Sequence, residues 1–133
     1  MNKIKEVSEI IEKFYDPFSW LNISKKSINT LGFEKAIVLA RMIEEETFFR
    51  NIANDEEILE TYAEPYTIEN VLIKKGWFLC NLQDFNKELG IDQDRLVLII
   101  EELIQMGLII KTEEGRPPKF YYKIGDNLHI YWI

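Results

Sequence analysis

The chain has 133 residues, 47% of them hydrophobic, and a formal net charge of −7 at pH 7. That length predicts one domain, because a chain of this size buries enough apolar surface for a single core. No apolar run reaches the roughly 18 residues that a membrane-spanning helix needs. The first residues lack a secretory signal pattern, and the lone Cys80 excludes an internal disulfide. We therefore expect a cytoplasmic protein.

The N-terminal part of the chain predicts an amphipathic helix followed by an apolar loop. Apolar side chains recur at helical spacing in residues 3–14, and Pro17 ends the pattern. The apolar residues of the segment 18–23 are expected to seal one edge of the core. We treat residues 1–30 as this appendage and residues 31–133 as the main domain, with an acidic insertion at residues 51–75.

A long helix is expected from Thr30 or Gly32 to Arg50, followed by a short helix capped by Asn54 or Asp55. Residues 67–73 favour a strand. A turn at Lys75-Gly76 either joins this strand to the Trp77 strand in a hairpin or does not, and the sequence leaves both possibilities open. The buried stripe predicted for the long helix consists of Phe33, Ala36, Ile37, Ala40, Ile43 and Phe48, with Glu34, Arg41, Glu44 and Glu45 outside.

From Gly76 onward the pattern predicts a strand, two helices and a strand hairpin. The first of these helices covers Leu82–Leu89 and ends at Gly90, a suitable left-handed cap. The second covers Asp92–Met106, with Asp92 as its N-cap. Strands follow at residues 108–110, 120–124 and 128–133. The order predicts an α+β fold, a winged helix-turn-helix with an N-terminal amphipathic helix and a C-terminal β-hairpin extension.

Several strings in this order are similar to those of a known family. They are Gly76-Trp77-Phe78, Leu89-Gly90, Gly107-Leu108-Ile109, the wing Gly115–Ile124 and the upstream Leu31–Leu39. In these strings the chain resembles the winged-helix domain at the N-terminus of phage and plasmid replication initiators, the replisome-organiser and DnaD-like group. The resemblance covers residues 31–50 and 76–124. It implies a winged helix of phage or mobile-element origin that acts in replication or regulation.

The second helix of the predicted helix-turn-helix, residues 92–106, is the one expected to contact DNA. Its side chains depart from the chemistry that the resemblance implies. Where the family tends to present basic or polar residues, this chain has Val97, Leu98, Glu101 and Glu102. Carboxylates facing phosphates repel them and release no counterions. Residues 110–125, by contrast, carry four basic and two acidic residues, a local charge of +2. The candidates for DNA contact are therefore Gln93 and Arg95 at the helix start and Lys111, Arg116, Lys119 and Lys123 around the wing.

A protein partner or a homodimer is the second expectation. Apolar residues on the helix 92–106 exceed what one buried stripe requires, so either they pack under neighbouring elements or they form an exposed strip. Residues 41–69 add nine acidic residues against Arg41 and Arg50. They form either a solvated surface or the surface of a DNA-mimicking inhibitor, such as an anti-CRISPR or anti-restriction protein, that does not bind DNA. The interface candidates are Val97, Leu98, Glu101, Glu102, Ile104, Gln105, Glu44, Glu45, Asp55, Glu56 and Glu57.

The sequence predicts no enzyme, cofactor or metal site. His129 is the single histidine and lies in an apolar segment, and the carboxylates lack metal-ligand spacing. Cys80 is expected to be a buried structural thiol. The predicted function is therefore a small winged-helix protein that binds DNA through its wing, a protein through its acidic and apolar helix, or both.

Overall fold

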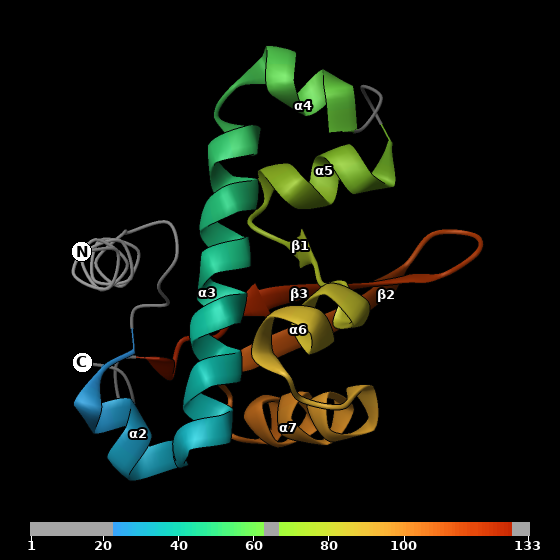
Figure 1. Ribbon diagram of the computed structural model, residues 1–133. Coiled ribbons are helices and arrows are strands. Elements are labelled where there is room, and N and C mark those ends of the chain that lie inside the picture. The colour runs from blue at the N-terminus through green and yellow to red at the C-terminus, as the bar shows by residue number, and fades with distance from the viewer. Residues whose placement is uncertain (1–22, 63–66, 129–133) are drawn as a thin grey trace, which may run out of the picture.

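The computed structural model describes residues 23–62 and 67–128, which form six helices and a three-stranded antiparallel sheet (Figure 1). The fold is α+β, as the sequence predicts. In chain order the elements are α2 (Lys25–Leu31), α3 (Phe33–Ala53), α4 (Glu56–Tyr62), α5 (Ile68–Lys74), β1 (Phe78–Leu79), α6 (Leu82–Leu89), α7 (Gln93–Gln105), β2 (Ile109–Glu114) and β3 (Lys119–Ile124).

Helix α3 is the longest element, and the other helices pack along it (Figure 1). Its buried residues Val38, Leu39 and Met42 lie in the main core, together with Phe78 of β1 and Tyr122 of β3. A smaller cluster at the C-terminal end of α3 joins it to α4 and α5 through Ile52, Leu59 and Ile73. The main core also contains Leu31, Phe85, Leu96, Ile99, Ile100, Leu103, Leu108 and Ile109.

The sheet has the order β1-β3-β2, so the last of the three described strands lies in the middle. Strand β1 pairs with β3 through Phe78 and Tyr122, and β2 pairs with β3 from Ile109 and Ile124 out to the hairpin tip. After β3 the chain folds back onto the start of β2, where the Gly125 N–H donates to the Leu108 carbonyl at 2.8 Å. A Cβ atom at Gly125 would lie 2.1 Å from the Gly107 carbonyl oxygen, so this return requires glycine.

The predictions for α6 and α7 are confirmed, within one residue at each end for α7. The Asn81 side chain caps α6 by accepting from the Gln83 and Asp84 N–H groups at 2.9 and 3.3 Å. Gly90 ends α6 with φ 69° and ψ 23°, the left-handed conformation expected of it. Asp92 stands at the N-cap of α7, although its side chain makes no capping hydrogen bond.

The structure differs from the sequence analysis at two places, the β-leaning residues 67–73 and the segment before Gly32. Residues 67–73 do not extend into a hairpin but form α5, whose first turn is capped by Thr67 Oγ1 accepting from Asn70 N–H at 3.1 Å. Helix α2 was not expected. Ser24 caps it through the Ser27 N–H at 3.0 Å, and Gly32 separates it from α3. The short helix after residue 54 is confirmed, with Asp55 accepting from Glu57 N–H and Ile58 N–H.

The buried stripe predicted for α3 needs correction at three positions. Phe33 is 61% exposed and Phe48 47% exposed, whereas Arg41, expected outside, is 8% exposed. Ala36 and Ala40 are buried as predicted. Arg41 is buried because α6 packs over it and supplies a carboxylate and an aromatic ring, described below.

Some sequence predictions fall outside the described residues. These are the helix 3–14, the apolar residues 18–21 and residues 129–133 of the last predicted strand; Leu128 itself is helical rather than extended. Among the described residues, no helix combines the length and apolar character needed to cross a membrane.

Candidate functional site

Helix α7 has a buried face and an exposed face of different chemistry. Leu96, Ile99, Ile100 and Leu103 point into the core, each at most 4% exposed. The opposite side carries residues spaced three or four apart, so they share one face. We call this set the α7 face: Asp94, Val97, Leu98, Glu101 and Gln105, all exposed.

Two ion pairs tie the side of α7 next to this face to α3. Arg95 Nη2 lies 3.2 Å from Glu34 Oε1, and Lys35 Nζ lies 2.8 Å from Glu102 Oε2. The hydrogen bonds that Arg95 donates to Glu34 raise the pKa of Arg95, and the hydrogen bond that Lys35 donates to Glu102 lowers the pKa of Glu102. Arg95 is thus already paired with an anion within the molecule, and the α7 face itself carries no basic residue.

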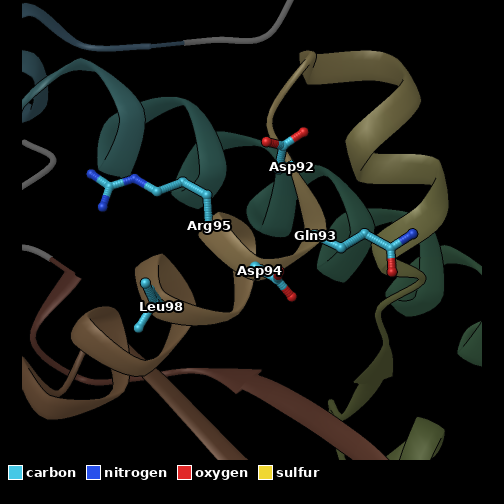
Figure 2. Close-up of a pocket in the computed structure, with 5 residues that line it drawn as sticks. All are labelled: Asp92, Gln93, Asp94, Arg95 and Leu98. Carbon is cyan, nitrogen blue, oxygen red and sulfur yellow. The ribbon is translucent and has the colours of Figure 1, made fainter.

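The start of α7 forms a shallow hollow lined by Asp92, Gln93, Asp94, Arg95 and Leu98 (Figure 2). In the close-up, the Arg95 and Gln93 side chains reach in opposite directions from the helix (Figure 2). Of the two DNA-contact candidates at the start of α7, Arg95 donates to Glu34, whereas Gln93 is exposed and forms no hydrogen bond with another described residue. The lining of the hollow thus combines the carboxylates of Asp92 and Asp94 with the apolar side chain of Leu98.

The hairpin formed by β2 and β3 is the second exposed feature, and it projects beyond the neighbouring elements (Figure 1). Residues 113–120 are all exposed. Lys111 Nζ lies 4.2 Å from the centre of the Phe120 ring, and Lys123 Nζ lies 5.9 Å from that of Trp77. Arg116 and Lys119 have no carboxylate within 4 Å in the described part of the chain. Lys111 and Lys123 therefore each lie over an aromatic ring, whereas Arg116 and Lys119 contact no ring among the described residues.

Much of the acidic stretch is engaged within the molecule. Arg41 binds Glu45 at 2.7 Å, Glu44 at 3.8 Å and Glu88 of α6 at 2.6 Å, and its guanidinium lies 4.8 Å from the Phe85 ring centre. Arg50 lies 3.8 Å from Glu46. Asp55 is occupied as a helix cap. The hypothesis of a DNA-mimicking surface therefore depends mainly on the α4 carboxylates, including the exposed Glu56 and Glu57.

Cys80, which was expected to be buried, is half-buried, and the Arg41 cluster changes its pKa less than burial does. Burial opposes the charge on Arg41, but the hydrogen bonds and charges of Glu88 and Glu45 outweigh it and raise the pKa of Arg41. Burial is also the main reason why the pKa of Cys80 rises to about 12, and the Glu45 charge adds to it. Because the thiolate is the reactive form, this environment fits a structural thiol.

Some of the interface candidates are exposed to solvent, whereas others pack against the core or form ion pairs within the molecule. Val97 and Leu98 are 44% and 56% exposed, and Glu101 and Gln105 accompany them on the α7 face. The prediction that Ile104 belongs to the interface is wrong, since Ile104 packs against the main core and is only partly exposed. Glu34 and Lys35 were missed as site residues. Their pairing with α7 joins positions more than 60 residues apart, and no local pattern in the sequence reports it.

The described residues contain no group of three or more histidine, cysteine or carboxylate side chains placed to hold a metal ion. No protein-family model, curated protein or solved structure matches the chain.

Proposed function

We propose that residues 31–124 form a winged helix that binds nucleic acid through the β2–β3 hairpin as a non-enzymatic factor in replication or regulation. Helix α3, then β1, α6, α7, β2 and β3 in that order, with α4 and α5 inserted between α3 and β1, and the antiparallel arrangement β1-β3-β2 support this fold. The likeness of residues 31–50 and 76–124 to replication initiators of the replisome-organiser group supports the role.

The observation that carries the proposal is the pair of unpaired cations on the projecting hairpin. Arg116 and Lys119 flank the tip, are exposed, and have no carboxylate within ion-pair distance among the described residues. A cation that is not already neutralised can displace the counterions of a phosphate, and this release favours binding at low salt. Lys111, held over Phe120, adds a further positive charge nearer the base of the hairpin, on the face opposite to Lys119.

Helix α7 is a poor alternative for this contact. Its face presents Asp94 and Glu101, and its one arginine is bound to Glu34. Helices that read the major groove place base-contacting residues at this position and basic residues near the phosphates. The nucleic-acid contact is therefore assigned to the hairpin, with Gln93 as the one candidate that α7 adds.

The test is the salt dependence of binding to a duplex and to a single-stranded oligonucleotide, measured by fluorescence anisotropy. We expect binding by the native chain at low salt and a large loss in the double variant Arg116→Ala, Lys119→Ala. If each cation neutralises one phosphate of duplex DNA, the slope of log K against log salt should fall in magnitude by about 0.9 per residue.

The matched control is the double variant Lys74→Ala, Lys75→Ala, which also removes two exposed positive charges. It should retain the native slope, because these lysines lie at the C-terminal end of α5 and are not part of the hairpin. Equal losses in both double variants would show a general charge effect and would refute the hairpin site. No binding to either oligonucleotide at low salt would refute the proposed function itself.

A further inference from the structure

The α7 face combines exposed apolar side chains with unpaired carboxylates. We propose that it is a docking surface for a protein segment that carries apolar anchors flanked by lysine or arginine. This surface is separate from the hairpin, and the proposal stands whether or not the hairpin binds nucleic acid.

The apolar part of the surface is centred on Leu98 and Val97. Leu98 is 56% exposed and Val97 44%, although the buried side of the same helix already provides four core residues. Leu98 lies three residues after Arg95 and four before Glu102, so both ion pairs to α3 lie beside it. Helix α7 is thereby held in place on α3, and a partner meets a preorganised apolar patch. Preorganisation lowers the entropic cost of binding.

The charge of the surface selects the partner. Asp94 and Glu101 flank the apolar pair on the same face, and Asp92 adds a third exposed carboxylate at the helix start. None of the three forms an ion pair with another described residue. The nearest basic residue on α7, Arg95, is already paired with Glu34. A basic segment would find complementary charge around its apolar anchors, which favours both the rate and the specificity of association.

A second copy of this chain fits the same surface poorly. In an antiparallel two-fold contact with Val97 opposite Leu98, the spacing puts Asp94 of one copy opposite Glu101 of the other. A parallel two-fold contact puts each carboxylate opposite its own copy. Like charges facing each other across an interface are destabilising, so the geometry favours a basic partner over self-association.

The experiment uses the full chain and a displayed library of helix-forming peptides. Each peptide has a fixed stripe of leucines, and its flanking positions vary among lysine, glutamate and serine. We expect selection on the native chain to enrich lysine at the flanks. The enriched peptides should lose roughly tenfold or more in affinity with Leu98→Asp, because a buried apolar anchor dominates such contacts. The double variant Asp94→Asn, Glu101→Gln should lose several-fold, and less at high salt.

The matched control is Ile68→Asp, which adds the same charge at a comparably exposed apolar residue of α5. It should bind the enriched peptides as the native chain does. Flanks without lysine enrichment, or equal binding by Leu98→Asp and Ile68→Asp, would overturn the proposal. So would a concentration-dependent dimer that Leu98→Asp abolishes, because the occupant would then be a second copy. If Leu98→Asp does not fold, the double variant decides, since its carboxylates are exposed and a retained affinity would contradict the charge argument.

Discussion

The α7 face and the β2–β3 hairpin are both exposed, yet they present opposite charges to a partner. On α7 the one arginine is bound to Glu34, while Asp94 and Glu101 form no ion pair within residues 23–62 and 67–128. On the hairpin the charges of Arg116 and Lys119 remain available. The charges that a surface presents to a partner are therefore those not already in ion pairs within the molecule. Counting charged residues along the sequence does not identify them.

The two regions also differ in how rigidly they are held. The buried side of α7 lies in the main core, and Glu34 and Lys35 tie its flank to α3. The hairpin beyond Lys111 and Tyr122 has no described ion pair and depends on its own strand pairing. A preorganised surface suits a shaped protein partner, whereas a projecting basic hairpin suits a phosphate backbone that varies in position.

The largest expected effect is the difference in the free energy of unfolding between a substitution on the buried side of α7 and one on its exposed side. Leu103→Ala removes a fully buried side chain and should lower the free energy of unfolding by about 2–5 kcal/mol. Leu98→Ala removes a side chain that is 56% exposed and should change it by no more than about 0.5 kcal/mol. Denaturant titration measures both. A loss for Leu98→Ala as large as that for Leu103→Ala would place Leu98 in the core and end its role as a docking residue.

A smaller effect tests whether α7 lies near bound nucleic acid. The double variant Asp94→Asn, Glu101→Gln removes two negative charges from the α7 face. If the hairpin alone meets the phosphates, its effect on duplex affinity should be at most about two- to threefold, because these exposed carboxylates would contact no phosphate directly and salt screens their longer-range repulsion. Fluorescence anisotropy with the duplex used for the hairpin variants gives the comparison. A gain of tenfold or more would place α7 against the duplex and contradict the division of roles.

The parts of the fold that the sequence predicted well depend on local signals. Helix α6 begins at the Asn81 cap and ends at the left-handed Gly90, both readable within a few residues. The strand tendency predicted for residues 67–73 was misleading because the isoleucines and the valine of this segment favour strands. The Thr67 cap and the packing of Ile73 against α3 and α4 stabilise a helix instead. Tertiary contacts commonly override weak β-propensity in this way.

The candidate surfaces show the same limit. The exposure of Val97 and Leu98 was one of two open readings, because a surplus of apolar residues does not reveal which side neighbours cover. Arg41 was expected outside, since a charged residue on a helix is usually solvated. Its burial depends on Glu88 and Phe85, which approach only when α6 packs on α3. Pairs of this kind link distant parts of the chain, and periodicity carries no information about them.

The smallest effect concerns the ion pairs that set the charge of α7. Hydrogen bonding from Lys35 lowers the pKa of Glu102, so in Lys35→Met the titration midpoint of Glu102 should rise toward the ordinary glutamate value. A group whose pKa is depressed in the folded state adds stability above its unfolded pKa and loses that contribution as pH falls through the folded pKa. The pH window therefore lies at and below about 4.3, the ordinary value for glutamate.

Carbon-detected NMR titration of the Glu102 carboxyl group measures this midpoint directly. Lys111→Met removes a lysine from the hairpin instead and should leave the midpoint unchanged. An unchanged midpoint in Lys35→Met would mean that the pair to α3 does not form in solution. Glu102 would then join Asp94 and Glu101 as an unpaired carboxylate, and the charge contrast between α7 and the hairpin would be larger than the structure indicates.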